Sequence, residues 1–206
     1  MSTLFYLVRH GETASNREGR YQGRLDVPLN EEGREQARRL ATRLAGVAFD
    51  AAYASDLSRA VETARILLEG RDVELRLDPR LREMSYGRWE GLTAEEVQER
   101  FPEEWEAYRR DAVATRIAGG ESLEDVRRRV AAFAEDVLAD APRRVLVVSH
   151  GAALKTLLFA LVGLDLRLRG RFVLDNASLT ILRAGGSSKP RVLRVNDVEH
   201  LGRPLP

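Results

Sequence analysis

The chain has 206 residues, of which 44% are hydrophobic and 32% charged, with 33 basic and 32 acidic side chains and a net charge of +1. This composition is typical of a globular protein with one substantial core, and it excludes a generally basic surface for nucleic acid or anionic membranes. Because cysteine is absent, a disulfide framework, a thiolate nucleophile and a cysteine-ligated metal are excluded as well.

Short apolar runs alternate with amphipathic patterns in the first part of the chain. Residues 3–8 are apolar on both faces, which predicts a strand covered by helices on each side. The long segment that follows, 10–29, has no periodic pattern, and loops of this length are typically functional. The next predicted elements are a helix, a strand, a helix and a strand, at residues 30–44, 51–54, 57–68 and 73–77. This alternation indicates β-α-β units and a parallel sheet.

The pattern loosens between residues 80 and 120, where loops and short polar helices predict a small cap inserted over the sheet. An amphipathic helix then follows the capping-box pair Ser122 and Asp125. The remaining predicted elements are a strand at 144–149, a buried helix that stops at Gly163, and strands at about 177–182 and 191–195. We therefore expect one domain over residues 1–206, a three-layer α/β/α fold with a mostly parallel sheet of about six strands and a helical cap at about 80–120.

Polar side chains follow three of the predicted strands at the point where each strand ends. Arg9 and His10 close the first strand, Arg59 follows the second in "SDLSRA", and His150 follows "RVLVVS". Ligands of open parallel sheets bind beyond the carboxyl ends of the strands, so we expect these four side chains to share one pocket.

The residue types in this pocket predict a phosphate site. Arginine binds phosphate oxygens bidentately, and the N–H groups of the helix after His150 would add further donors. Gly11 permits a close approach of the backbone to a ligand, and the Asn16 amide can donate. The alternative is a metal centre of His10, His150 and carboxylates, but two arginines would repel a divalent cation. A histidine acting on phosphorus is therefore the favoured interpretation.

Four blocks of sequence occur in a distinctive order: "LVRHGET" with "SN" after it, "SDLSRAVETA", "LREMSYGRWEG" and "VSHG". Together they resemble the histidine phosphatase superfamily, also called phosphoglycerate-mutase-like, over about residues 3–151. The resemblance implies that His10 is the nucleophile and becomes phosphohistidine, with Arg9, Arg59 and His150 around the phosphoryl oxygens. It further implies that Glu83 donates a proton to the leaving group. The candidate substrate-binding residues are Asn16, Gln22, Gly23 and Gly151.

The predicted function is metal-independent hydrolysis of a small phosphomonoester, with no cofactor. The closest alternative is a cofactor-dependent phosphoglycerate mutase, and a non-catalytic sensor of phosphate ligands is a third hypothesis. "EMSYGRWEG" looks more like the phosphatase branch, because Met84 stands where an arginine tends to follow the acid in the mutases. A sensor would need the arginines but has no use for Glu83.

Three aromatic and two arginine side chains of the predicted cap are interpreted first as structural. We expect Trp89, Trp105 and Tyr108 to pack in the core or the cap, with the substrate pocket as their alternative place. Arg109 and Arg110 are expected on the surface, the alternative being contact with a second anionic group of the substrate.

The expected surroundings are those of a cytoplasmic enzyme. The first residues lack a signal-peptide pattern, and no apolar run reaches the roughly 20 residues of a membrane span. The predicted partner is a small phosphomonoester, without nucleic acid or membrane, and a homodimer is left open. Sugar phosphates, phosphoglycerates, ribazole phosphate and nucleotide-like esters all stay open as substrates.

Overall fold

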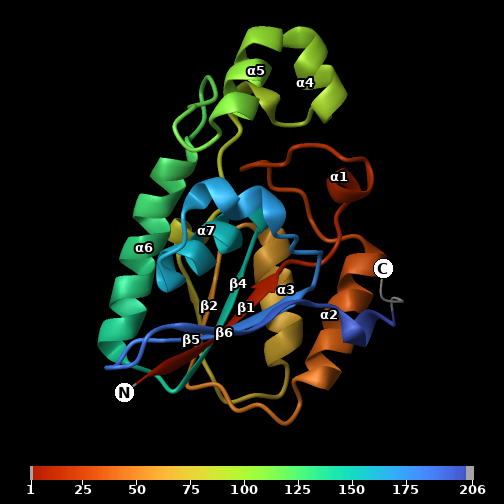
Figure 1. Ribbon diagram of the computed structural model, residues 1–206. Coiled ribbons are helices and arrows are strands. Elements are labelled where there is room, and N and C mark those ends of the chain that lie inside the picture. The colour runs from red at the N-terminus through yellow and green to blue at the C-terminus, as the bar shows by residue number, and fades with distance from the viewer. Residues whose placement is uncertain (1, 203–206) are drawn as a thin grey trace.

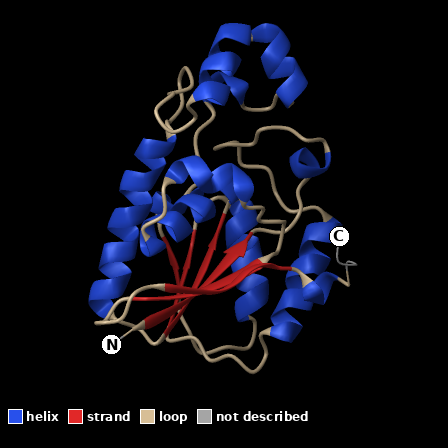
Figure 2. Ribbon diagram, in the orientation of Figure 1, coloured by secondary structure: helices blue, strands red, loops and turns tan. Residues whose placement is uncertain are grey.

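The computed structural model describes residues 2–202 and contains a mixed sheet of six strands in the order β3-β2-β4-β1-β5-β6 (Figure 2). The first four of these strands are parallel, whereas β5 is antiparallel to both β1 and β6. The predicted α/β fold with a mostly parallel sheet is thereby confirmed. The strands are β1 (Thr3–Arg9), β2 (Ala51–Ala54), β3 (Leu75–Leu77), β4 (Arg144–Ser149), β5 (Leu179–Ala184) and β6 (Arg191–Asp197).

Helices cover both faces of the sheet (Figure 1). Successive side chains of a strand point to opposite faces, so Phe5 and Leu7 pack with α6 and α7, while Val8 packs with α2 and α3. This gives three layers with a core on each side of the sheet. The α-helices are α1 (Ala14–Arg17), α2 (Glu31–Arg43), α3 (Ser58–Leu68), α4 (Ala94–Arg100), α5 (Pro102–Arg110), α6 (Leu123–Asp140) and α7 (Gly151–Val162). The 3-10 helices are η1 (Pro79–Leu81), η2 (Gly87–Trp89), η3 (Leu166–Arg171) and η4 (Glu199–Leu201).

Three local expectations need correction. The strand expected at 73–77 covers Leu75–Leu77 only. The segment 10–29 contains the short helix α1, whose N-cap Thr13 accepts from the backbone N–H of Asn16. Four residues are too few to show helical periodicity, which is why the pattern did not reveal this helix. The strand expected at 177–182 begins at Leu179, because Ala177 has a φ of 55°, which breaks an extended chain.

A close contact between two backbones fixes the path of the chain after β1. A Cβ on Gly11 would lie 2.3 Å from the carbonyl oxygen of Gly33, and one on Gly33 would lie 2.1 Å from that of Glu12. The side chain of Gln36 also accepts from the N–H of Glu12. The loop that begins at His10 therefore lies directly on the first turns of α2.

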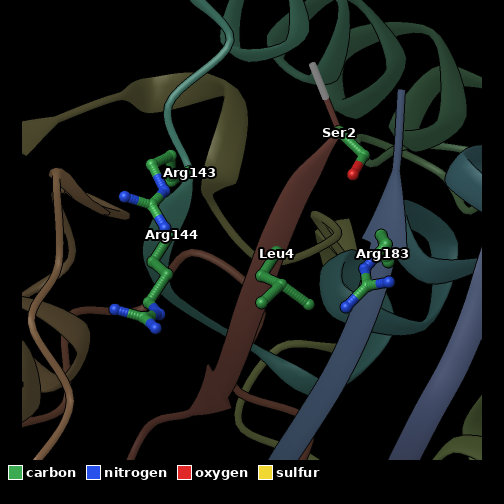
Figure 3. A pocket seen from close by; sticks show the side chains of 5 residues that line it. All are labelled: Ser2, Leu4, Arg143, Arg144 and Arg183. Carbon is green, nitrogen blue, oxygen red and sulfur yellow. The ribbon is translucent and has the colours of Figure 1, made fainter. Parts of the chain in front are cut away.

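The opposite end of the strands has a different character. A hollow of about 370 Å³ lies beside Leu4 at the amino end of β1 (Figure 3). Leu4 is paired with Arg144 on one side and Arg183 on the other, and Ser2 and Arg143 complete the lining. Among the described residues this hollow is lined by no histidine or carboxylate, so it lacks the acid–base groups that the predicted site needs.

The contact between the loop and α2 leads to a stability prediction. We expect Gly33→Ala to lower the free energy of unfolding by about 1–3 kcal/mol, because the new methyl group would collide with backbone that cannot move independently. Gly46→Ala is the matched control, since a Cβ there meets nothing within 4 Å. Urea denaturation of both variants checks the prediction. Equal stability of the two variants would contradict it.

Candidate active site

The two histidines of the predicted site lie side by side at the carboxyl edge of the sheet. Arg9 at the end of β1 is in register with Ser149 at the end of β4, and the N–H of His10 donates to the Ser149 carbonyl at 2.9 Å. The next residues, His10 and His150, are both buried, with ring centroids 5.1 Å apart. The parallel register of β1 and β4 is thus what pairs the two imidazoles.

The hydrogen bonds of His10 define its tautomer. Its Nδ1 lies 2.7 Å from the carbonyl oxygen of Gly11, which can only accept, so Nδ1 carries the proton and Nε2 has a free lone pair. Burial lowers the pKa of His10 well below 6.5, and the positive charges of Arg59 and Arg9 lower it further. His10 is therefore a neutral imidazole near neutral pH, which is the nucleophilic form.

His150 has the opposite tautomer. Its Nδ1 accepts from Nε of Arg59 at 3.2 Å, so in the neutral ring Nε2 carries the hydrogen. Burial, Arg59 and His10 hold the pKa of His150 well below 6.5. Among the described residues this Nε2 has no hydrogen-bond partner. A buried N–H without an acceptor costs about 1–3 kcal/mol, a cost that an anionic ligand can remove.

Arg59 and Arg9 supply the positive charge of the site. Arg59 is fully buried and donates to the carbonyls of Leu25 and Gly23 at 2.7 and 2.8 Å, and Arg9 donates to that of Leu174 at 2.7 Å. Within residues 2–202 neither guanidinium forms an ion pair with a carboxylate, and the buried Nε of Arg9 has no partner. Burial lowers the pKa of both side chains, but arginine stays charged in proteins. The charge is thus available to an anion.

Glu83 is the carboxylate of this site, and its contacts correct one expectation. Its oxygens accept from the backbone N–H groups of Met84, Ala152 and Ala153 at 2.8, 3.2 and 3.1 Å. The expectation that the first N–H groups of α7 would bind phosphate is therefore wrong for Ala152 and Ala153. The positive end of the helix dipole orients the acid instead.

A cavity of about 130 Å³ lies between these groups. It places Asn16, Gln22 and Gly23 beside His10, but Gly151 does not line it, so the structure does not support direct substrate contact at Gly151. Of the four side chains expected to share one pocket, Arg9, His10 and Arg59 line this cavity and His150 does not. His150 is fully buried and contacts Arg59 and the His10 ring instead. The lining residues are Arg9, His10, Asn16, Arg20, Tyr21, Gln22, Gly23, Arg59, Glu83 and Tyr86.

Three of these lining residues were missed by sequence reasoning, namely Arg20, Tyr21 and Tyr86. Arg20 and Tyr21 directly precede the candidates Gln22 and Gly23 in "RYQG", and Tyr86 lies within the block "LREMSYGRWEG". These positions were the available signal. The cation of Arg20 is already paired with Glu18 and Glu96. The two tyrosine rings contact each other, with centroids 4.9 Å apart. Arg20, Tyr21 and Tyr86 thus form one wall of the cavity, made of two aromatic rings and an arginine whose charge is already paired.

Three aromatic residues of the segment after Glu83, namely Trp89, Trp105 and Tyr108, pack together outside the cavity. The fully buried ring of Trp89 contacts those of Tyr21, Trp105 and Tyr108, with centroids 5.2–5.8 Å apart. None of Trp89, Trp105 and Tyr108 lines the cavity, in agreement with the packing interpretation.

The arginine pair of α5 also lies outside the cavity. Arg109 and Arg110 border a separate hollow of about 280 Å³ together with Arg167 and Arg169 of η3. They do not meet the ligand space beside His10, so the alternative of a second anionic contact in that cavity has no support.

Two further kinds of site were sought in residues 2–202. No three His, Asp or Glu side chains there are grouped so that they could hold a metal ion. No helix in this part of the chain is long and apolar enough to cross a membrane.

Comparison with known proteins places this arrangement in a family. The model of the histidine phosphatase superfamily (branch 1) matches residues 5–198. Phosphoserine phosphatase 1 of Hydrogenobacter thermophilus is 36% identical over 95% of this chain and 93% of its own length. A protein of Enterobacter sp. (strain 638) named "probable phosphoglycerate mutase" is 39% identical over 85% of this chain and 82% of its own.

A solved structure agrees with these sequence matches. The α-ribazole phosphatase of Shigella flexneri superimposes with a TM-score of 0.87 and 29% identity, over 95% of this chain and 97% of that one. The matched family model spans nearly the whole described chain, including both histidines and Glu83. The protein therefore belongs to branch 1 of the histidine phosphatase superfamily.

Proposed function

We propose that this protein hydrolyses small phosphomonoesters through a phosphohistidine formed on His10. The observation that carries the proposal is the neutral His10, which lines a cavity next to the buried guanidinium of Arg59 and the partly buried one of Arg9. Within residues 2–202 neither guanidinium has a carboxylate as ion-pair partner. That combination fits an anionic phosphoryl group, which needs a nucleophile on phosphorus and positive charge on its remaining oxygens.

The first step transfers the phosphoryl group to the protein. Nε2 of His10 attacks phosphorus, the bond to the ester oxygen breaks, and Glu83 protonates the departing alkoxide. Arg9 and Arg59 stabilise the charge that spreads over the phosphoryl oxygens, and His150 supports them by accepting from Nε of Arg59 and packing against the His10 ring. Two arginines supply this charge from the chain itself, so we propose that no metal ion is required.

The second step releases phosphate. Glu83, now a carboxylate, takes a proton from water, whose oxygen attacks phosphorus while the bond to Nε2 breaks. Inorganic phosphate leaves, and His10 returns to its neutral form. Asn16, Gln22 and Gly23 line the same cavity and are proposed to contact the substrate.

We further propose that residues 80–120 act as a cap within a single domain. This segment supplies Glu83 and Tyr86 to the cavity, and its helices α4 and α5 lie beyond the carboxyl edge of the sheet (Figure 1). The size of this cap would select the alcohol part of the substrate. A cytoplasmic location and a homodimer stay predictions.

The phosphoprotein intermediate tests the proposal directly. Quenching a reaction with ³²P-labelled ester should trap a phosphoprotein that is labile in acid and stable in alkali. We expect His10→Ala to abolish this phosphoprotein and to lower turnover at least about 10³-fold. Excess EDTA should change neither the amount of phosphoprotein nor the turnover of the unmodified protein. A phosphoprotein formed by His10→Ala would mean that another residue is the nucleophile.

The protonation state of His10 is a second prediction. Since burial and the two arginines lower the pKa of His10 and of His150, both rings should stay neutral as the pH falls through 6.5, where an exposed histidine gains its proton. Ring ¹⁵N NMR between pH 8 and 5 measures this. A titration midpoint for His10 at or above 6.5 would contradict the nucleophile described here.

Phosphoglycerate mutase activity is the second candidate, favoured by the likeness to the Enterobacter protein. We expect phosphate release to exceed isomerisation on a panel that contains phosphoserine, ribazole phosphate and 3-phosphoglycerate with a bisphosphoglycerate primer. The measurement compares 2-phosphoglycerate formed with free phosphate released from the best ester. Isomerisation faster by tenfold or more, about 1.4 kcal/mol in barrier, would reverse the assignment.

A further inference from the structure

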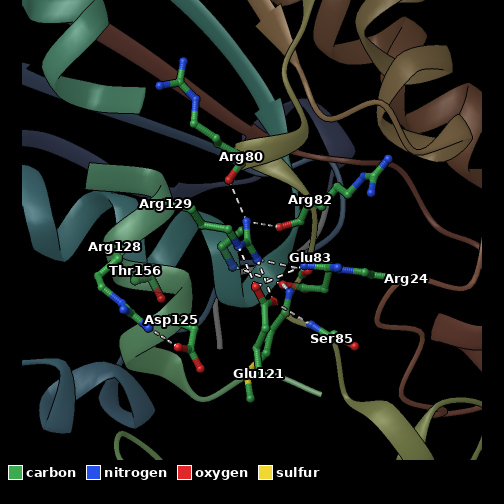
Figure 4. Close-up of polar contacts among 12 residues, drawn as sticks. Arg24, Arg80, Arg82, Glu83, Ser85, Glu121, Asp125, Arg128, Arg129 and Thr156 are labelled. Atoms are coloured by element: carbon green, nitrogen blue, oxygen red, sulfur yellow. Dashed lines mark hydrogen bonds and ion pairs between the residues drawn. The ribbon is translucent and has the colours of Figure 1, made fainter. Parts of the chain in front are cut away.

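Arg129 on α6 binds the backbone on which Glu83 is carried (Figure 4). Its Nη1 donates to the carbonyl oxygens of Arg80 and Arg82, both at 2.6 Å, and its Nη2 donates to that of Glu83 at 3.1 Å. The side chain is only 15% exposed. One buried guanidinium therefore holds three carbonyls of the short segment that ends in the proposed acid.

Glu121 completes this arrangement from the other side. It forms a two-point ion pair with Arg129, at 3.0 and 3.1 Å, and accepts from the N–H of Ser85 at 2.9 Å. Arg24, next to the cavity residue Gly23, also pairs with Glu121 at 3.1 Å. Charge-assisted bonds of this kind are stronger than neutral ones. The residues on both sides of Glu83 are thus bound to one buried ion pair.

The geometry points to Arg129, together with Glu121, as the positioning residue that sets the place of the Glu83 carboxyl group. The inference rests on the proposed role of Glu83 as the leaving-group acid. Arg129 contacts the Glu83 backbone and not its carboxylate, which the N–H groups of Met84, Ala152 and Ala153 hold instead. Its charge also contributes, as the smallest of several causes, to lowering the pKa of His150. We therefore infer that its main effect on the reaction passes through the position of the acid.

A displaced Glu83 should affect catalysis differently for different leaving groups. Proton donation depends on distances of a few tenths of an ångström, and a misplacement of about 1 Å can cost about 10²-fold. An alkoxide needs a proton in order to leave, whereas an activated aryl oxide does not. A displaced Glu83 should therefore slow alkyl esters far more than aryl esters.

Three variants test the inference on phosphoserine and on p-nitrophenyl phosphate. Arg129→Met keeps the length of the side chain but removes its donors. Arg127→Met is the matched control, because Arg127 lies on the same helix, is half exposed and, among residues 2–202, forms an ion pair with Glu124 alone. Glu83→Gln removes the acid itself and gives the reference effect.

We expect Arg129→Met to lower kcat/KM for phosphoserine about 10- to 100-fold and for the aryl ester less than about threefold. Arg127→Met should change neither. The ratio of the two activities is measured on one preparation, so it does not depend on the fraction of molecules that are folded. A merely structural role would lower both activities in proportion and leave the ratio unchanged.

A double variant sharpens the test. If Arg129 acts through the acid, adding Arg129→Met to Glu83→Gln should cost less than about threefold more on phosphoserine, because the displaced group no longer donates a proton. Full additivity of the two losses would overturn the inference. Should Arg129→Met fail to fold, Arg129→Lys and Glu121→Gln carry the same ratio test, with the same direction expected.

The outcomes separate this inference from the proposed function. If Glu83→Gln changes the ratio and Arg129→Met does not, the positioning role is wrong and the acid stands. If Glu83→Gln leaves the ratio unchanged, the role of Glu83 is wrong, and the role of Arg129 is overturned with it. If Glu83→Gln and Arg129→Met change the ratio in the same direction, the acid role of Glu83 and the positioning role of Arg129 are both supported.

Discussion

Buried positive charge without a carboxylate partner is the constraint on which the active site depends. Arg9 and Arg59 lose their hydration, which costs several kcal/mol per ion, and the protein compensates with neutral carbonyl acceptors rather than with acids. Among the described residues no carboxylate forms an ion pair with either charge, although Glu83 is close enough to oppose the lowering of the pKa of both arginines by burial. Burial lowers the pKa of His10 and His150, and the two positive charges lower it further. The same charge that would bind a phosphoryl group thus adds to burial in keeping His10, the proposed nucleophile, free of its second proton.

Much of this arrangement could be predicted from the sequence, because it follows from where strands end. "LVRHG" and "VVSHG" each finish an apolar strand on a histidine, and the parallel pairing of Arg9 with Ser149 brings the two rings together. Apolar runs buried on both faces also predict a covered parallel sheet. The local pattern was sufficient here because residues that directly follow two neighbouring parallel strands meet at the same edge of the sheet.

The rest could not be predicted, because it depends on contacts between distant segments that have no periodic signal. Glu83 was expected to be an acid near the substrate, but nothing in "LREMSY" shows that its carboxylate binds the first turn of α7, some 70 residues later. That contact takes away the helix N–H groups assigned to phosphate. The wall formed by Tyr21 and Tyr86 likewise joins two loops that only the folded chain brings together.

The acid and the cap come from one segment, yet they are attached to different parts of the molecule. Glu83 is tied by its backbone to α6 and by its carboxylate to α7, and both helices pack on the sheet that carries His10. Beyond it, Trp89 and Tyr108 pack among the aromatic rings of the cap. Within the described chain α4 and α5 contribute no residue to the cavity lining, whereas Glu83 does. We therefore expect a change in these two helices to leave the proposed acid in place beside His10. The proteins that this chain resembles are named for phosphoserine, phosphoglycerate and ribazole phosphate, and one fold can host such different specificities.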